Sequence, residues 1–172
     1  IANNTSEIFF SFERDTLHAV NSTSEDSGSE IGFKSSFDIK RGQLNFYLGS
    51  LFPRVGVINV ASGLSDSSRY NLVGISAHKE IENYLVKFDL AKKINLKRST
   101  ASGIVEDDRT DAALGIEYAP STYDQLSLTL EGSLWVDSAG VYYIPGSSGT
   151  LLEDTKSLSY NVVYSRNTVD EK

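Results

Sequence analysis

Residues 125–136, QLSLTLEGSLWV, alternate between apolar and polar side chains with a period of two. Leu126, Leu128, Leu130 and Leu134 share one parity, whereas serine, threonine and glutamate dominate the other. Successive side chains of a β-strand point to opposite faces, so this period predicts a strand with one apolar and one polar face. In a soluble protein the leucines would line a core, and in a membrane barrel they would face lipid around a polar interior.

Similar alternating segments recur along the chain, with clusters of Gly, Ser, Asp and Asn between them, and helical periodicity is nearly absent. The expected strands are residues 7–19, 30–40, 43–59, 69–78, 83–97, 110–119, 124–137 and 155–166. Four long polar connections alternate with three short ones. In an up-and-down sheet every second connection lies at the same end, so all the long connections are expected at one end.

We therefore predict an all-β fold, a closed antiparallel up-and-down transmembrane β-barrel of about eight strands, because closure removes the open edges of the sheet. The chain is expected to form a single domain over residues 1–172, with the barrel at about 7–166 and a short tail at 167–172.

Two of these strands depart from the simple pattern. Strand 43–59 contains Pro53, where the apolar parity flips, and proline lacks the N–H that a sheet ladder needs. We expect a bulge or bend near Phe52–Pro53. Strand 69–78 is ambiguous, because Leu72 and Val73 lie on opposite parities.

The polar parity holds small residues with interspersed charges of both signs, which fits the narrow interior of an eight-stranded barrel. Buried charges need partners, so we expect an interior polar network. Its expected members are Glu13, Lys34, Asp38, Lys87, Asp89, Glu117 and Glu131. The apolar parity is nearly free of charge, and Lys92 is expected near an interface, where it can snorkel. The expected lipid-facing residues are Phe33, Phe37, Val86, Phe88, Leu114, Ile116, Leu126, Leu128, Leu130 and Val162.

Aromatic residues gather near the strand ends, as they do at the two interfaces of a bilayer. The expected aromatic girdle comprises Tyr84, Tyr118, Tyr123, Trp135 and Tyr164.

Bulk composition excludes several classes of function. The net charge is −7 and no run of Lys or Arg appears, which argues against binding to nucleic acid. The absence of cysteine excludes disulfides and thiolate metal sites. No apolar run is long enough for a transmembrane helix, so we expect the chain to cross a bilayer only as a barrel. The sequence opens with Ile1 rather than Met, for which we expect removal of a signal peptide, with trimming of the chain as the alternative.

The alternation, the long polar loops, the short turns and the aromatic rings together resemble the small eight-stranded bacterial outer-membrane barrels, such as the transmembrane domain of outer-membrane protein A and outer-membrane protein X. The likeness covers about residues 7–166. In that family the last strand ends in an aromatic residue. Here SLSYNVVY ends at Tyr164, but SRNTVDEK follows it, which departs from the family pattern. The resemblance implies location in a bacterial outer membrane and contact with its lipids, including lipopolysaccharide.

Residues suited to catalysis are few. Some small outer-membrane barrels modify lipid A with a His and a Ser near the extracellular rim, and His18 with Ser22 or Ser24 is the one such combination here. His78 is expected at the short-turn end, away from lipid A. Acidic clusters such as 106–111 lack EF-hand spacing. We predict no catalytic residue, no metal and no cofactor.

The predicted function is that of a monomeric outer-membrane protein without an open pore, in envelope integrity or in adhesin-like contact with an extracellular ligand through its loops. Two alternatives stay open at this point. One is a soluble lipocalin-like barrel with an apolar ligand, although a Gly-x-Trp signature is missing from the first strand. The other is a lipid A-modifying enzyme on the same membrane barrel.

Overall fold

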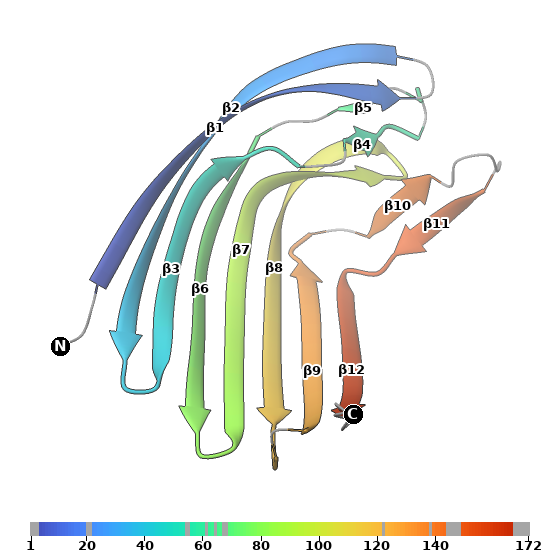
Figure 1. Ribbon diagram of the computed structural model, residues 1–172. Helices are drawn as coiled ribbons and strands as arrows, with labels where there is room; N and C mark the ends of the chain where they lie inside the picture. Colours follow the sequence, from blue (N-terminus) through green and yellow to red (C-terminus); the bar gives the residue numbers. More distant parts are fainter. Residues whose placement is uncertain are drawn as a thin grey trace, which may run out of the picture.

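The computed structural model is an all-β protein whose main sheet has eight antiparallel strands (Figure 1). It describes residues 4–19, 22–53, 56–60, 62–63, 65–66, 69–121, 123–137, 139–143 and 149–166, without the side chains of 11–28, 65, 142 and 143. The strand order is β1-β2-β3-β6-β7-β8-β9-β12. The prediction of eight strands in up-and-down order is thereby confirmed. Within the described residues, β1 and β12 form the two edges of the sheet.

The strands of this sheet differ greatly in length. Their bounds are β1 Asn4–Ala19, β2 Ser22–Ile39, β3 Gly42–Leu51, β6 Tyr70–Ile81, β7 Tyr84–Thr100, β8 Gly103–Tyr118, β9 Asp124–Trp135 and β12 Lys156–Arg166. Two short hairpins complete the fold: β4 Val57–Ile58 pairs with β5 Ser65–Asp66, and β10 Gly140–Tyr143 pairs with β11 Thr150–Glu153.

The connections divide between the two ends of the sheet as the sequence predicts. The β2–β3, β6–β7 and β8–β9 connections lie at one end, the lower end in Figure 1, and the β1–β2 and β7–β8 connections and both short hairpins lie at the other. The first two lower turns are tight, and Arg41 and Glu82 adopt positive φ angles of 58° and 54° there.

Two of the expected long loops are in fact strand. Ser22 pairs with Ala19, and Thr100 pairs with Gly103, so β1–β2 and β7–β8 are long hairpins. The Ser-rich and Asp-rich composition of these segments suggested loops, but the antiparallel register continues through them. Backbone pairing satisfies the N–H and C=O groups whatever the side chains are. The other two long connections contain the β4–β5 and β10–β11 hairpins.

The predicted bulge at Phe52–Pro53 is wrong, because β3 ends at Leu51, before the proline. The register shift instead lies between Lys93 and Leu96 of β7, where Ile94 and Asn95 stand against the single residue Asp108 of β8. Asn95 has a φ of 58°, a left-handed conformation that asparagine tolerates better than most residues. A bulge increases the local twist, and the upper part of β7, which stays paired with β8, is strongly bent in Figure 1.

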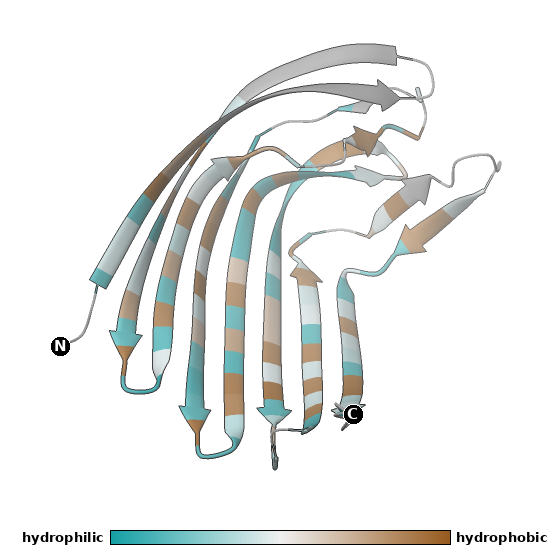
Figure 2. Cartoon of the chain, viewed as in Figure 1, coloured by the Kyte–Doolittle hydropathy of each residue, from teal (hydrophilic) through white to brown (hydrophobic). Residues whose placement is uncertain are grey.

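Almost no hydrophobic side chain of the described part of the chain is buried. Only Trp135 and Val141 fall in that class, with 5% and 6% of their surface exposed. The sheet is strongly curved (Figure 1), and its apolar residues alternate with polar ones along the strands (Figure 2). The described residues therefore form almost no buried apolar core.

Candidate functional site

One face of the sheet is apolar from β1 to β12. Residues paired on neighbouring strands continue this face from strand to strand: Leu114 stands between Phe88 and Leu130, and Ile116 stands between Val86 and Leu128. All ten residues predicted to face lipid lie on this face. Eight of them are exposed and Phe37 and Val86 are half-buried. Of the two residues that made strand 69–78 ambiguous, Val73 lies on this face, in the same row as Leu48.

Aromatic side chains collect on this face at its short-turn end. The rings of Tyr84 and Tyr118 stack with their centroids 4.7 Å apart. Tyr164 stands opposite Leu126 and donates a hydrogen bond of 2.7 Å to Asp124, and Tyr123 is exposed nearby. The structure thus brings Tyr84, Tyr118 and Tyr164 to one end of the apolar face, and Tyr123 lies in the β8–β9 connection at that end.

Trp135, the fifth residue expected in the girdle, lies on the opposite face. It pairs with Arg109 and is buried. Its parity is that of Ser133 and Glu131, and that signal was present in the sequence. Its position near a strand end suggested an interface residue, but the parity of a strand decides which face a side chain joins.

The polar face carries the side chains expected in the interior network. Lys87 and Glu117 form an ion pair of 2.5 Å, and the amide of Gln125 donates to Glu117 at 3.2 Å. Asp38 accepts a hydrogen bond of 3.3 Å from Gln43. These contacts join three of the seven predicted residues to partners on neighbouring strands or across the β2–β3 turn.

Of the other predicted network residues, those whose side chains the structure describes make no such contact with a described side chain. Lys34, Asp89 and Glu131 have no ion-pair partner among the side chains that the structure describes, and the side chain of Glu13 lies outside the described residues. Lys34 stands opposite Glu7 in the register. Asp89 and Glu131 both line a hollow on the polar face.

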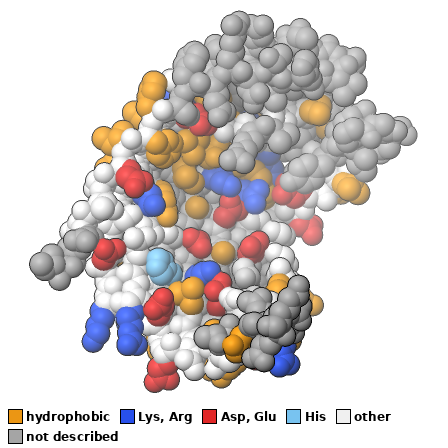
Figure 3. Space-filling model, viewed as in Figure 1, with side chains coloured by type: hydrophobic (Ala, Val, Ile, Leu, Met, Phe, Trp, Pro, Cys, Tyr) orange, Lys and Arg blue, Asp and Glu red, His pale blue; other side chains and the backbone are white. Residues whose placement is uncertain are grey.

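That hollow has a volume of about 300 Å³ and lies over the middle of the sheet. Small residues form its floor, including Gly74, Ala91 and Ala113. Charged side chains of both signs gather on this curved face (Figure 3). The polar side of the alternating strands is therefore the concave side, and its small residues leave room between the charged ones.

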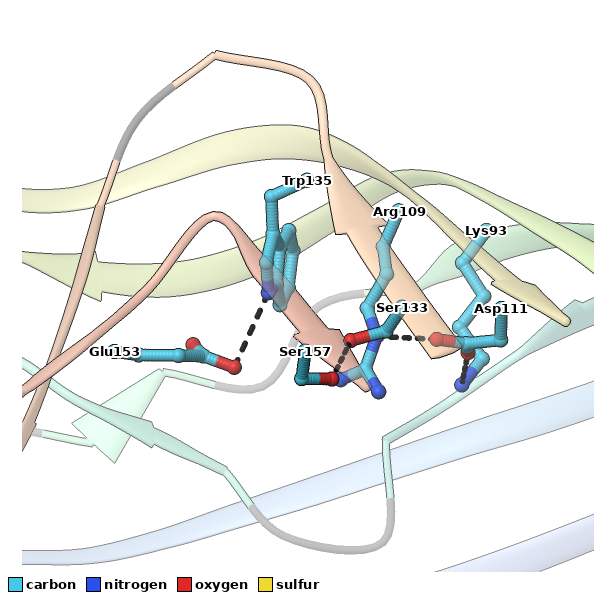
Figure 4. Close-up of polar contacts among 7 residues, drawn as sticks. All are labelled: Lys93, Arg109, Asp111, Ser133, Trp135, Glu153 and Ser157. Atoms are coloured by element: carbon cyan, nitrogen blue, oxygen red, sulfur yellow. Dashed lines mark hydrogen bonds and ion pairs between the residues drawn. The ribbon is translucent and has the colours of Figure 1, made fainter. Parts of the chain in front are cut away.

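A buried cluster lies at the long-hairpin end of the concave face, and we call Arg98, Asp107, Trp135 and Glu153 the rim cluster. The guanidinium carbon of Arg98 lies 4.2 Å from the centroid of the Trp135 ring, within cation–π range. Arg98 and Asp107 form an ion pair of 3.6 Å with 3% and 1% of their side chains exposed. Trp135 Nε1–H donates to Glu153 Oε1 at 3.2 Å (Figure 4).

The rim cluster attaches the β10–β11 hairpin to the main sheet. Glu153 ends β11, and the buried Gly140 begins β10, which lies against β7. A Cβ atom on Gly140 would lie 2.9 Å from Nη2 of Arg98 and 2.7 Å from Oε2 of Glu153. Only glycine lets the hairpin approach this closely without a shift of those side chains.

Further ion pairs lie next to the rim cluster. Asp111 accepts from Lys93 at 2.8 Å and from Arg109 at 2.6 Å, and Ser133 and Ser157 share a hydrogen bond of 2.6 Å (Figure 4). Sequence reasoning noted residues 106–111 only as an acidic cluster without EF-hand spacing, and it did not single out Arg98 or Glu153. Part of the reason is the bulge, which reverses the parity of β7 beyond Lys93 and brings Arg98 to the concave face.

The bulge itself carries an ion pair on the outer face, where Lys92 lies in the same row as Val73 and Leu48. Lys92 and Asp108 lie 2.9 Å apart, and the backbone N–H of Asn95 donates to Asp108 at 3.2 Å. The hydrogen bond from Lys92, with that from Asn95, holds the pKa of Asp108 below its ordinary value. Lys92 is thus paired at the edge of the apolar face.

Few groups in the described part of the chain suit catalysis. The side chain of His18, with those of Ser22 and Ser24, lies outside the described residues. His78 is exposed on the concave face of β6, opposite Lys87. No group of three or more His, Cys, Asp or Glu side chains in the described ranges is placed to hold a metal ion.

No protein-family model, curated protein or solved structure matches this chain. Among the described residues, no helix is long and apolar enough to cross a membrane.

Proposed function

We propose that this chain is an integral β-barrel protein of a bacterial outer membrane, with no catalytic role and no open pore. The single observation that carries the proposal is the apolar outer face, which runs across all eight strands, while ion pairs such as Lys87–Glu117 and Lys93–Asp111 lie on the concave face. In water, each exposed Leu, Ile or Phe would forgo about 1.5–3 kcal/mol of burial. A bilayer removes that penalty, because lipid covers the face.

The dimensions of the apolar face support a membrane span. On β7 it runs from Tyr84 to Lys92, which is nine residues. A tilted transmembrane strand needs about 9–11 residues. The Tyr84–Tyr118 stack lies at one limit of the face, and the Lys92–Asp108 ion pair lies at the other. Aromatic and snorkelling residues are those expected at the two interfaces.

Closure of the sheet into a barrel is part of this proposal. An up-and-down sheet with an even number of strands has antiparallel first and last strands, so β1 and β12 run in directions that permit pairing. Lipid-exposed sheet edges are not tolerated in a bilayer, because their N–H and C=O groups have no partner there. Pairing between β1 and β12 satisfies those groups.

The interior argues for a filled barrel rather than a channel. Ion pairs such as Lys87–Glu117 and Lys93–Asp111 lie on the concave face, and the rim cluster adds bulk at one end. Eight strands enclose a space that side chains fill. We propose that the protein acts through the two long hairpins and the β4–β5 and β10–β11 hairpins at one rim, in envelope integrity or surface contact, as a monomer surrounded by outer-membrane lipids including lipopolysaccharide.

The first test is electrophoretic mobility in SDS with and without boiling, on protein extracted from membranes with detergent. We expect a need for detergent and a heat-dependent change of mobility. Protein that is soluble without detergent and shows no change would overturn the proposal and favour a soluble barrel. Hydrolysis or transfer of lipid A acyl chains by the folded protein, lost in His18→Ala, would overturn the absence of catalysis.

Adjacent substitutions on β9 sharpen this test. Leu128→Arg places a charge on the outer face and is expected to cost about 2–4 kcal/mol in a bilayer. Thr129→Lys, the matched control, places a charge on the concave face opposite Gly115, where there is room. The proposal requires that only Leu128→Arg lowers the amount of heat-modifiable protein in the membrane. Equal effects of the two substitutions would contradict it.

A further inference from the structure

The register of the sheet defines a row that crosses every strand. Successive paired residues lead from Lys156 on β12 through Lys92 on β7 to Ile8 on β1. The complete row is Lys156, Leu134, Thr110, Lys92, Val73, Leu48, Phe33 and Ile8. The bulge at Lys93–Leu96 lies beyond this row and does not disturb it. The row therefore relates each position on one edge strand to a position on the other.

In a closed barrel with tilted strands, such a row does not return to its starting residue. Eight strands about 4.8 Å apart give a circumference of about 38 Å, measured across the strands. A tilt of about 35–45° displaces the returning row by about 27–38 Å along the strand. At about 3.4 Å per residue this is a displacement of about 8–11 residues.

The strands themselves restrict this displacement further. Outward-facing residues must meet outward-facing residues, so the displacement is even, which leaves eight or ten. Its direction is fixed by the strand bounds, because β12 extends from Lys156 only toward Arg166, and β1 extends from Ile8 mainly toward Ala19. Ile8 consequently stands opposite Tyr164 for a displacement of eight and opposite Arg166 for a displacement of ten.

Two misplaced apolar side chains distinguish these registers. On the eight described strands of the sheet, every exposed large hydrophobic residue lies on the outer face except Phe9 and Val163. Phe9 is 45% exposed and its ring lies over Gly32, and Val163 is 47% exposed. They lie on the two edge strands, one on each. A displacement of eight places them opposite each other, whereas a displacement of ten places Ser165 opposite Phe9.

The outer face favours the same register. A displacement of eight sets Ile8 and Phe10 against Tyr164 and Val162, so apolar residues meet in two successive outward rows. A displacement of ten would set Ile8 against Arg166, with a charge beside the apolar band.

We infer that β1 and β12 close the barrel in one register, with Ile8 opposite Tyr164 and Phe9 against Val163 on the inner side. This inference rests on the proposed function, because it takes the sheet to be a closed membrane barrel. Phe9 then lies between Gly32 and Val163, so the exposed apolar surfaces of both edge strands bury each other on the inner side. In this register, β1 and β12 each pair with the open edge of the other.

Disulfide mapping tests the register on a clean background, because the chain has no cysteine. Phe9→Cys is combined in turn with Asn161→Cys, Val163→Cys and Ser165→Cys, all on the inner parity of β12. Disulfides form only between Cα atoms about 4.4–6.8 Å apart. After oxidation of the membrane-extracted protein, we expect most intramolecular cross-linking, located by mass spectrometry of the joined peptides, in the variant with Val163→Cys.

The outcomes separate the register from the proposed function, since each variant is also scored for heat-dependent mobility in SDS. Strongest cross-linking through Ser165→Cys or Asn161→Cys, in protein that keeps the mobility change, overturns the register and leaves the barrel standing. Disulfides formed only between two chains, or none in any heat-modifiable variant, overturn the inference as well. Loss of the mobility change in the cysteine-free parent overturns the proposed function itself.

Discussion

The two ends of the sheet are built differently. At the short-turn end, tight turns join the strands and the exposed Tyr84 stacks on the half-buried Tyr118. The Lys87–Glu117 ion pair there keeps 44% and 27% of its side-chain surfaces exposed. At the long-hairpin end, a bulge bends β7, and the rim cluster buries Arg98 and Asp107 almost completely. The short-turn end is held by many weak, exposed contacts, whereas the long-hairpin end depends on a few buried ones.

This difference locates where the fold is sensitive to substitution. Removing one member of a buried ion pair strongly lowers the free energy of unfolding, because the other charge stays buried without a partner. Exposed pairs and stacked rings each contribute little. We therefore expect substitutions in the rim cluster to have larger effects than substitutions of equal size among the short turns.

The largest effect is expected for Asp107→Ala, which leaves Arg98 buried beside Trp135 without its carboxylate partner. We expect a loss of about 3–5 kcal/mol in the free energy of unfolding. Trp135 is the only tryptophan, so its fluorescence during urea titration reports this end of the molecule. The matched control at the other end is Glu117→Ala, for which we expect about 0.2–1 kcal/mol. Equal losses for the two variants would contradict the contrast between the ends.

A smaller effect is expected at the bulge. Asn95 has a left-handed backbone conformation, which costs most residues with a Cβ about 1–2 kcal/mol. Asn95→Ala is expected to lose up to about that amount, and Asn95→Gly is expected to be nearly neutral, since glycine populates positive φ freely. Urea midpoints of the two variants check this. A larger loss for glycine than for alanine would show that the side chain, not the backbone angle, stabilises the bulge.

At the short-turn end, Tyr84→Leu removes the stacked ring but keeps an apolar side chain toward the outer face. Aromatic pairs add about 0.5–1.5 kcal/mol beyond burial, and we expect a loss in that range. Tyr160→Leu is the matched control, because Tyr160 is exposed on the same face and has no ring contact with a described side chain. Resistance to unfolding in cold SDS compares the two, and a larger effect at Tyr160 would argue against the stack.

The smallest effect is expected for the Lys92–Asp108 pair. The pKa of Asp108 is lowered in the folded protein, so its stabilising contribution is present above the ordinary Asp pKa of about 3.9 and is lost as the pH falls through the folded value. Asp108→Asn should lower stability by about 0.2–1 kcal/mol at neutral pH, and the difference from the parent should shrink as the pH falls from the ordinary Asp pKa through the lower, folded one. A difference that does not change as the pH is lowered would assign the effect to another interaction.

Most of the fold could be predicted from the sequence. Period-two alternation is a local property, and it was sufficient to predict eight strands, their order and the face on which residues such as Leu114 and Leu128 lie. Loop composition was a poorer guide, since residues 22–29 and 103–109 read as polar loops yet lie in strands. These residues form strands because they pair with a neighbouring segment, and the sequence of one segment alone does not show which segment it will pair with.

The candidate site was less predictable for a related reason. Lys87 and Glu117 lie on the polar parity of adjacent strands, so their pairing follows from the alternation. Arg98 lies on the concave face only because the bulge shifts the parity of β7. No residue pattern near Asn95 predicted that shift. Trp135 shows the converse, because its parity gave the right face and its place near a strand end suggested the wrong one.

The two open edges, β1 and β12, bear on the order in which this molecule folds. Every pairing in the eight-stranded sheet joins strands that follow one another along the chain, directly or across a short hairpin, and such local contacts form quickly. In the proposed closed barrel, contact between β1 and β12 is the one pairing that brings the two ends of the sheet together, and the entropy cost of closing this long loop is paid last. Until the final strand is synthesised and paired, β1 presents an edge that other chains can join. The slowest step of assembly and the step most exposed to aggregation are then the same event.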